Sequence, residues 1–186
     1  VRRTLTRVAA EHWGRWSDML AAAPKCPERR AIETLATSED FRAAFSALPM
    51  FTQQMCVEAY QSWLWNRIAL GLAECCESPD LGTLAGVSIP TLGPGAELSE
   101  PWAGAARAVL ESEGITVDSL RIPGLRRPVF GVTPRALLMR ASGVTLSVPM
   151  HDEFASSEST KRWAVTLSFS LPRGSYATVL LRELGC

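Results

Sequence analysis

The sequence predicts an α+β protein, with a mainly helical first part followed by antiparallel strands and a C-terminal helix. Three observations support this class. Apolar residues recur at helical spacing in several segments between residues 3 and 76. From Trp163 to Leu171 they alternate with small polar residues instead, which is typical of a strand with one apolar face. The sequence Pro172–Ser175 is that of a turn, and a further helical pattern comes directly after it.

The chain opens with short helical patterns. We expect one helix over Arg3–Leu20, and the Pro-bounded loop 23–27 separates it from the next helical segment. Two further helices are expected over 29–37 and 39–47, the second of them capped by Ser38. This region indicates helix packing and no chemistry.

A long, strongly apolar helix is predicted over residues 50–76. Its apolar face follows i, i+3, i+4 spacing through Met55, Ala59, Tyr60, Trp63, Leu64, Ile68 and Leu72. We expect Trp63 and Trp65 to be core residues. The same segment carries polar residues whose spacing does not require a single patch: Gln61, Ser62, Asn66 and Arg67.

Residues 77–98 have a loop composition, with a short strand expected at 87–89. The run Gly93-Pro94-Gly95 lacks the Lys-Ser/Thr ending of a phosphate-binding loop, and no helix follows it directly, which argues against a nucleotide site. Ser99 is the expected cap of a helix that continues through Leu110 and ends at Gly114.

Three arginines surround a Pro-Gly turn in residues 121–127, namely Arg121, Arg126 and Arg127. Two interpretations remain open for this turn. It is either a solvated surface turn or a phosphate contact, because guanidinium groups match phosphate oxygens bidentately.

The last third of the chain has strand patterns. We expect strands over 128–131, 136–140 and 144–150, which join the strand 163–171 in one antiparallel sheet. The C-terminal helix is expected to begin at Tyr176, with Ser175 as its cap, and to cover this sheet.

Composition excludes several classes of protein. Lys and Arg balance Asp and Glu over the chain, but residues 121–186 hold nine basic against four acidic residues. This asymmetry is compatible with an RNA-facing C-terminal part.

The five cysteines form no Cys-x-x-Cys pair, and the two histidines lie in unrelated contexts, so we expect no metal site and reduced thiols. No apolar run approaches the length of a membrane span.

Two segments resemble blocks of one enzyme family. Residues 171–184, Leu-Pro-Arg-Gly-Ser-Tyr-Ala-Thr-Val-Leu-Leu-Arg-Glu-Leu, resemble the C-terminal motif of the TruD-type tRNA pseudouridine synthases. Residues 59–67, Ala-Tyr-Gln-Ser-Trp-Leu-Trp-Asn-Arg, resemble the second block of the same family. The resemblance implies that 1–137 is an N-terminally incomplete insertion domain and that 138–186 is the C-terminal segment of the catalytic domain.

The family's nucleophile is an Asp in a Gly-x-Lys-Asp block, and this chain has no such block. None of its aspartates stands in that context: Asp18, Asp40, Asp80, Asp118 and Asp152. We therefore expect the nucleophile to lie outside this chain, in the missing N-terminal part of the synthase. The resemblance implies substrate contacts by Tyr176, beside the target base, and by Arg173, Arg126, Arg127, Gln61 and Asn66. For Tyr176 a purely structural role is the alternative, and Arg182 with Glu183 is expected to be a structural pair.

The function implied by the resemblance is isomerisation of uridine to pseudouridine in the D-arm of tRNA. That chemistry needs a carboxylate nucleophile, an extruded base on an aromatic surface and cations for the phosphates. It needs no metal or organic cofactor. The expected partners are tRNA and the missing N-terminal part, in the cytoplasm, and the isolated chain is expected to be inactive. The alternative is a non-catalytic RNA-binding or scaffold module.

Overall fold

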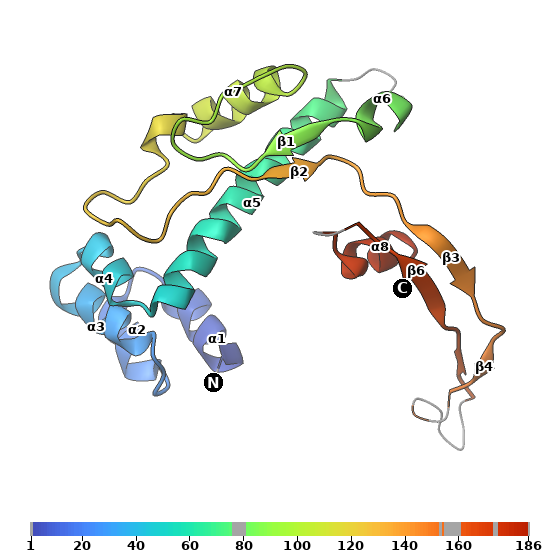
Figure 1. The fold of residues 1–186 in the computed structure, drawn as a ribbon. Coiled ribbons are helices and arrows are strands. Elements are labelled where there is room, and N and C mark those ends of the chain that lie inside the picture. Colours follow the sequence, from blue (N-terminus) through green and yellow to red (C-terminus); the bar gives the residue numbers. More distant parts are fainter. Residues whose placement is uncertain (1, 76–80, 153, 155–160, 173–174, 186) are drawn as a thin grey trace. The chain divides into compact units, whose positions relative to one another are not determined.

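The computed structural model describes residues 2–75, 81–152, 154, 161–172 and 175–185, and it has the predicted α+β composition (Figure 1). The contacts divide the chain into two compact units. The first unit comprises Val1–Glu77 and Pro90–Pro134, and the second unit comprises Ser78–Ile89 and Arg135–Cys186. Each unit has its own packing and is described by itself. No helix among the described residues is both long and apolar enough to cross a membrane.

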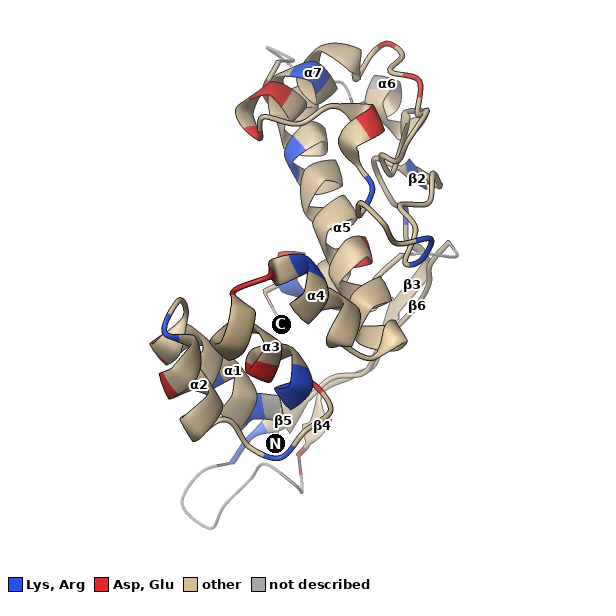
Figure 2. Cartoon of the chain, turned by 90° about the vertical axis from the view of Figure 1, so that its left-hand side faces the viewer, with Lys and Arg blue, Asp and Glu red and all other residues tan. Residues whose placement is uncertain are grey.

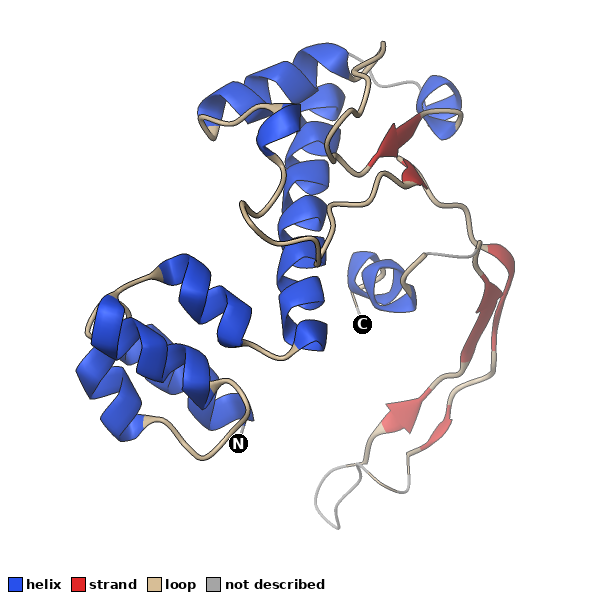
Figure 3. Cartoon of the chain, turned by 60° about the vertical axis from the view of Figure 1, so that its left-hand side comes forward, coloured by secondary structure: helices blue, strands red, loops and turns tan. Residues whose placement is uncertain are grey.

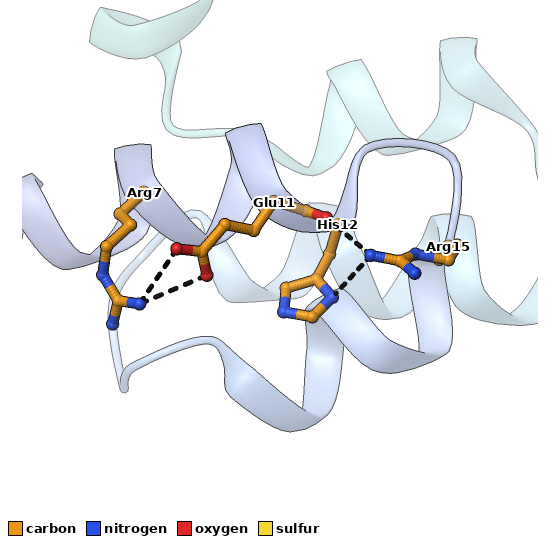
Figure 4. Close-up of polar contacts among 4 residues, drawn as sticks. All are labelled: Arg7, Glu11, His12 and Arg15. Carbon is orange, nitrogen blue, oxygen red and sulfur yellow. Dashed lines mark hydrogen bonds and ion pairs between the residues drawn. The ribbon is translucent and has the colours of Figure 1, made fainter.

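The first unit begins with two helices where one was expected. α1 runs from Arg2 to His12 and α2 from Trp16 to Ala22. Gly14 separates them with a φ of +85°, a conformation that ends a helix and suits a residue without Cβ. The guanidinium of Arg15 then donates to the carbonyl oxygen of Glu11 at 2.6 Å and thereby caps the end of α1 (Figure 4). The prediction of one continuous helix was wrong because it did not treat this glycine as a stop.

Helix α3 (Arg29–Ser38) agrees with the prediction, whereas the cap of α4 (Phe41–Ala47) does not. Oδ1 of Asp40 accepts the backbone N–H groups of Arg42 and Ala43, both at 2.9 Å. The hydroxyl of Ser38 instead donates to the carbonyl of Thr34 within α3. Asp40 is therefore the cap, since a carboxylate also suits the positive end of the helix dipole. The helices α1–α3 enclose a small core of Val8, Trp16, Met19, Ala23 and Ile32.

The long predicted helix is confirmed as α5, which extends from Met50 to Glu74. Its buried stripe consists of Gln53, Val57, Gln61, Leu64, Ile68 and Leu72. The stripe contains two glutamines because backbone carbonyls satisfy their amides; Nε2 of Gln53 donates to the carbonyl of Leu48 at 2.8 Å. Trp63 is 43% exposed, so the expectation that it is a core residue was wrong.

A second layer of the first unit packs on α5. Helix α7 (Ala103–Ser112) lies against α5 and is followed by the short helix η1 (Val117–Ser119). α7 begins at Ala103 and not directly after Ser99, because Trp102 occupies the cap position with its side chain buried. The strand expected over 128–131 did not form, and this segment is a loop that leads into β2 (Figure 3).

Strands β1 (Ser88–Pro90) and β2 (Pro134–Ala136) pair with each other at the points where the chain passes between the two units. Their pairing continues beyond the strands, since the backbone N–H of Thr91 donates to the carbonyl of Thr133 at 2.9 Å. The short helix α6 (Leu81–Ala85) precedes β1.

The second unit contains short antiparallel ladders and not the single sheet that was expected. β3 (Ser142–Leu146) pairs with β6 (Leu167–Ser170), and β4 (Met150–His151) pairs with β5 (Trp163–Ala164). An irregularity between Ser142 and Thr145 interrupts the first ladder, where Gly143 has a φ of +60°. Both ladders are two-stranded, so neither builds the continuous sheet that the sequence pattern suggested.

The C-terminal helix α8 begins at Ala177, not at Tyr176, and ends at Glu183. Tyr176 is its cap residue, with extended backbone and no side-chain cap hydrogen bond, so Ser175 does not cap the helix as predicted. The backbone N–H of Ser175 donates to the carbonyl of Pro172 instead, at 3.1 Å. The turn between β6 and α8 therefore uses Ser175 through its main chain.

Large apolar side chains of the second unit face outward. More than half of the residue's surface is exposed at Val144, Leu146, Val148, Met150, Trp163, Val165 and Leu184. Alternation along these strands predicted an apolar face correctly, but nothing within the described part of the unit covers that face. Exposed apolar clusters of this kind are typical of interaction surfaces, of ligand-binding grooves and of segments prone to aggregation.

Candidate nucleic-acid interface

Gln61 lies inside the first unit and joins two loops to α5. Its Nε2 donates to the carbonyl oxygens of Leu92 at 2.7 Å and of Gly131 at 2.8 Å, and the residue is only 4% exposed. The hydroxyl of Thr91 also donates to Gly131, at 2.8 Å. These bonds hold the end of the 121–133 loop against α5. The sequence predicted Gln61 as a substrate contact; that role stays a prediction, and the structure shows a side chain occupied with backbone carbonyls.

Close packing beside this network excludes any side chain at Gly93. A Cβ built on Gly93 would lie 2.2 Å from the carbonyl oxygen of Phe130, well inside van der Waals contact. The Gly-Pro-Gly run is thus explained by the close approach of two loops. That the run is not a phosphate-binding loop stays a prediction.

A row of stacked side chains crosses the partly exposed face of α5. The rings of Tyr60 and Trp63 stack with centroids 5.7 Å apart, and the guanidinium carbon of Arg67 lies 4.9 Å from the Trp63 centroid. Phe130 meets Tyr60 edge to face. Arg67 in turn forms an ion pair with Glu113, just after α7. The row therefore links α5 to α7 and to the loop before β2. Helical spacing could have indicated the contacts among Tyr60, Trp63 and Arg67, whereas those with Phe130 and Glu113 join segments far apart in the chain.

The electrostatics of this row act on the Tyr60 hydroxyl. Partial burial raises the pKa of Tyr60 above its ordinary value, and the Glu113 carboxylate raises it further, whereas the Arg67 guanidinium lowers it. Tyr60 is thus uncharged at neutral pH. Its role in this row is one of packing, as an aromatic ring between two others.

Asn66 is exposed on α5, one position before Arg67. It does not share the interior position of Gln61, so the two amides of the predicted block are not brought together on one surface. As a substrate contact Asn66 stays a prediction.

The arginines of the 121–127 turn are exposed, and none of them forms an ion pair with any described residue. The turn itself is closed by a hydrogen bond from the N–H of Leu125 to the carbonyl of Ile122 at 3.1 Å, with Gly124 at a φ of +78°. Figure 2 shows the basic residues of the chain in blue. A fixed turn with free guanidinium groups can bind phosphate oxygens.

In the second unit, Tyr176 presents its ring to the outside. The residue is 67% exposed and stands at the cap position of α8, directly after the turn that follows β6. Arg173, the other predicted contact of this turn, lies outside the described residues. Arg182 and Glu183 form an ion pair at 3.7 Å with both side chains largely exposed, and the structural role expected of this pair stays a prediction.

The acidic side chains of the described residues do not gather into a metal-binding group. No group of three or more His, Cys, Asp or Glu side chains there is placed to hold a metal ion. Asp40 is used as a helix cap, and Asp18 pairs with Arg15 at 3.8 Å. Four of the six predicted site residues are arginines or a tyrosine, the types that bind phosphates and stack on bases, and the other two are the amides Gln61 and Asn66.

A model of the family described as "tRNA pseudouridine synthase D (TruD)" matches residues 2–77 and 82–184. The match thus covers both units and both of the segments whose motifs resembled this family.

Individual relatives carry the same description. A probable tRNA pseudouridine synthase D of Methanopyrus kandleri is 37% identical over 94% of this chain and 43% of its own length. The tRNA pseudouridine synthase D of Aquifex aeolicus is 29% identical over 99% of this chain and 51% of its own. A third, from Pyrobaculum aerophilum, is 30% identical over 92% of this chain and 43% of its own. The chain spans about half the length of the curated relatives it matches.

Proposed function

Because the chain belongs to the TruD family of tRNA pseudouridine synthases, we propose that it acts in the isomerisation of uridine to pseudouridine in the D-arm of tRNA. The family match over nearly the whole chain is the observation that carries this proposal. In it, residues 1–137 are the insertion domain of the synthase and residues 138–186 are the C-terminal segment of its catalytic domain. Arg126 and Arg127 contact phosphates, and the nucleophilic Asp comes from a part of the enzyme that this chain does not include.

The exposed apolar strands support the proposal that another segment packs on the second unit. Leu146 and Val148 are 68% and 77% exposed, although they alternate with polar residues as the buried face of a sheet does. The relatives have about as much chain again as this one. We propose that the missing part of the synthase covers this face and brings its Asp toward Tyr176.

A reconstitution assay tests this proposal. The chain 1–186 is incubated with unmodified tRNA alone, and then as part of a longer protein in which the Gly-x-Lys-Asp block precedes it. Pseudouridine is detected by its carbodiimide adduct. We expect none from the isolated chain and turnover from the longer protein. Activity of the isolated chain would contradict the proposed source of the nucleophile, and an inactive longer protein would contradict the proposed reaction.

Tyr176 is proposed to pack against the target base, which its exposed ring at the start of α8 supports. In the longer protein, Tyr176→Phe keeps the ring and should keep most of the activity, whereas Tyr176→Ala should lose about tenfold or more, since stacking contributes about 1–3 kcal/mol per base. Equal loss in both variants would indicate that the hydroxyl matters and the ring does not.

The second candidate function is a non-catalytic RNA-binding or scaffold module, which the unpaired arginines of the 121–127 turn favour. A gel shift of the isolated chain with tRNA tests this role, because it measures RNA binding independently of catalysis. Salt-sensitive binding that is lost in Arg126→Ala/Arg127→Ala, together with an inactive longer protein, would support the module.

We place the protein in the cytoplasm, where tRNA is modified and thiols stay reduced. The described cysteines Cys26, Cys56 and Cys75 are free thiols, which is compatible with that compartment. Fractionation of cells that produce a tagged copy would test this placement, and enrichment with the membranes would contradict it.

A further inference from the structure

Arg42 brings a fourth guanidinium group to the arginine turn from a distant part of the sequence. It lies in the first turn of α4 and is exposed. A Cβ built on Gly124 would lie 3.2 Å from Nη1 of Arg42, so the guanidinium rests against the backbone of the turn. In Figure 1 the loop between α7 and β2 runs down toward α4. Nothing in the sequence pattern connected these two segments.

The backbone positions of the three turn arginines lie close to Gly124. Gly124 is two residues from Arg126 and three from Arg121, and two residues span at most about 7 Å of extended chain. The hydrogen bond that closes the turn, from Leu125 to Ile122, shortens this span further. The Arg42 guanidinium therefore lies against the turn whose backbone carries Arg121, Arg126 and Arg127.

No carboxylate neutralises this group among the residues that the structure describes. Asp40, two positions before Arg42, has its Oδ1 engaged by the backbone N–H groups at the start of α4. Glu39 and Asp118, the other nearby acids in sequence, form no ion pair with any described arginine. Some other arginines of the first unit are paired, namely Arg7 with Glu11, Arg29 with Glu33 and Arg67 with Glu113. Unpaired guanidinium forks at one place create a local positive potential that attracts anions.

The loop that carries three of the four arginines is held at its C-terminal end and contacted at Gly124. Gln61 and Thr91 both donate to the carbonyl of Gly131, at the C-terminal end of this loop. The loop is therefore attached to α5 by the part-buried hydrogen bond from Gln61 to Gly131 and lies against α4 through the Arg42 contact. A cation cluster on a fixed surface binds a chain of phosphates with less loss of conformational entropy than one on a free loop.

We infer that Arg42 binds the sugar-phosphate backbone of the RNA substrate, as part of one phosphate-binding surface with Arg121, Arg126 and Arg127. This inference rests on the proposed function, which makes the polyanion an RNA. The surface contacts phosphates and carries no base readout, because its donors are guanidinium groups on an exposed turn and helix.

The test measures tRNA binding by the chain 1–186 as a function of salt. Each phosphate contact adds about 0.7–0.9 to the slope of log affinity against log salt concentration. We expect Arg42→Ala to reduce that slope by about 1 and to weaken binding about tenfold at low salt, since it removes one charged donor to a phosphate. Arg42→Lys keeps the charge and should keep most of the slope.

Arg107→Ala is the matched control. Arg107 is an exposed arginine on α7 of the same unit and has no ion pair with any described residue, so the variant removes the same charge away from the turn. It should leave the slope unchanged. Circular dichroism confirms that each variant is folded; Ala is favourable in a helix, so Arg42→Ala should keep α4.

The outcomes separate the two proposals. If Arg126→Ala weakens binding while Arg42→Ala behaves as Arg107→Ala does, the inference about Arg42 is wrong and the proposed RNA contact of the turn stands. If the unchanged chain shows no salt-sensitive binding to tRNA, both fail. Reduced slopes for Arg42→Ala and Arg126→Ala, with Arg107→Ala unchanged, support the inference.

Discussion

Gln61 shows how one buried side chain holds two loops in place. Its amide nitrogen serves the carbonyls of Leu92 and Gly131, which lie 31 and 70 residues further along the chain. Such long-range bonds contribute most where the alternative is an unsatisfied buried acceptor. The predicted contact residue is thus better understood as one that positions the loop carrying Arg126 and Arg127.

The change Gln61→Leu should lower the free energy of unfolding by about 2 kcal/mol, because it leaves the carbonyl of Leu92 without its side-chain donor. Urea denaturation followed by circular dichroism measures this. Gln54→Leu on the same helix is the control, since Gln54 donates to Glu58 at the surface, and it should change stability by less than about 0.5 kcal/mol. Equal effects of the two variants would contradict the positioning role.

Substitution of glycine by alanine should have opposite effects on stability at Gly93 and at Gly104. Gly93→Ala puts a methyl group 2.2 Å from the Phe130 carbonyl oxygen and should destabilise by about 3 kcal/mol, since backbone must move. Gly104 lies in α7 with nothing within 4 Å of an added Cβ, so Gly104→Ala should be neutral or stabilise by up to about 0.5 kcal/mol. Thermal unfolding compares the two, and a tolerated Gly93→Ala would show that the loops are not closely packed.

Helices α5 and α7 are joined through the row of Tyr60, Trp63, Arg67 and Glu113. The ion pair at its end is partly exposed, so its own contribution to stability is small. The effect of this ion pair on the pKa of the neighbouring Tyr60 is easier to measure. The pair places one charge of each sign near Tyr60, and these charges act in opposite directions on the phenol.

Glu113→Gln should lower the pKa of Tyr60, because burial alone then raises it and the nearby carboxylate no longer does. The chain has two tyrosines, so absorbance titration in a Tyr176→Phe background reports Tyr60 alone. A phenol whose folded pKa is above its unfolded value of 10.0 stabilises the fold below pH 10 and loses this contribution as pH rises through the folded pKa. An unchanged titration in Glu113→Gln would show that the carboxylate does not act on Tyr60.

The two units of the molecule differ in how much apolar surface each one buries. Leu64, Ile68 and Leu92 of the first unit are fully buried, whereas the second unit exposes Leu146 in β3, Val148 just after it, and their neighbours. A two-stranded ladder without a covering layer is marginally stable in water. We therefore expect the units to open independently when this chain is studied alone.

Hydrogen exchange measures that difference. Backbone amides of α5 should exchange only through larger opening events, while those of β3 and β6 exchange through local opening with free energies closer to zero. In the longer protein of the reconstitution assay, the amides of β3 and β6 should become protected and those of α5 should change little. Equal protection of the amides of both units in the isolated chain would contradict the expected difference in stability between the units. Unchanged exchange of the β3 and β6 amides in an active longer protein would contradict the proposed covering of that face.

From the sequence alone it was possible to predict the α+β class, α5, the apolar alternation of the last strands and the family, because each depends on local periodicity or on a continuous motif. Helix boundaries were less predictable where one residue decides them: Gly14 divided the first helix, and Asp40 replaced Ser38 as a cap. At these positions several residues have compatible propensities, and the local backbone geometry selects among them.

Only the tertiary structure could decide what Gln61, Trp63 and Arg42 contact. Gln61 binds the carbonyls of Leu92 and Gly131. Trp63 packs between the side chains of Tyr60 and Arg67, and Arg42 lies against the backbone at Gly124. A pattern of spacing shows which residues share a helix face, but not which distant segment packs there, since packing depends on the shape and hydrogen-bonding needs of both surfaces. For that reason the sequence identified the arginine turn, and the fold was needed to add Arg42 to it.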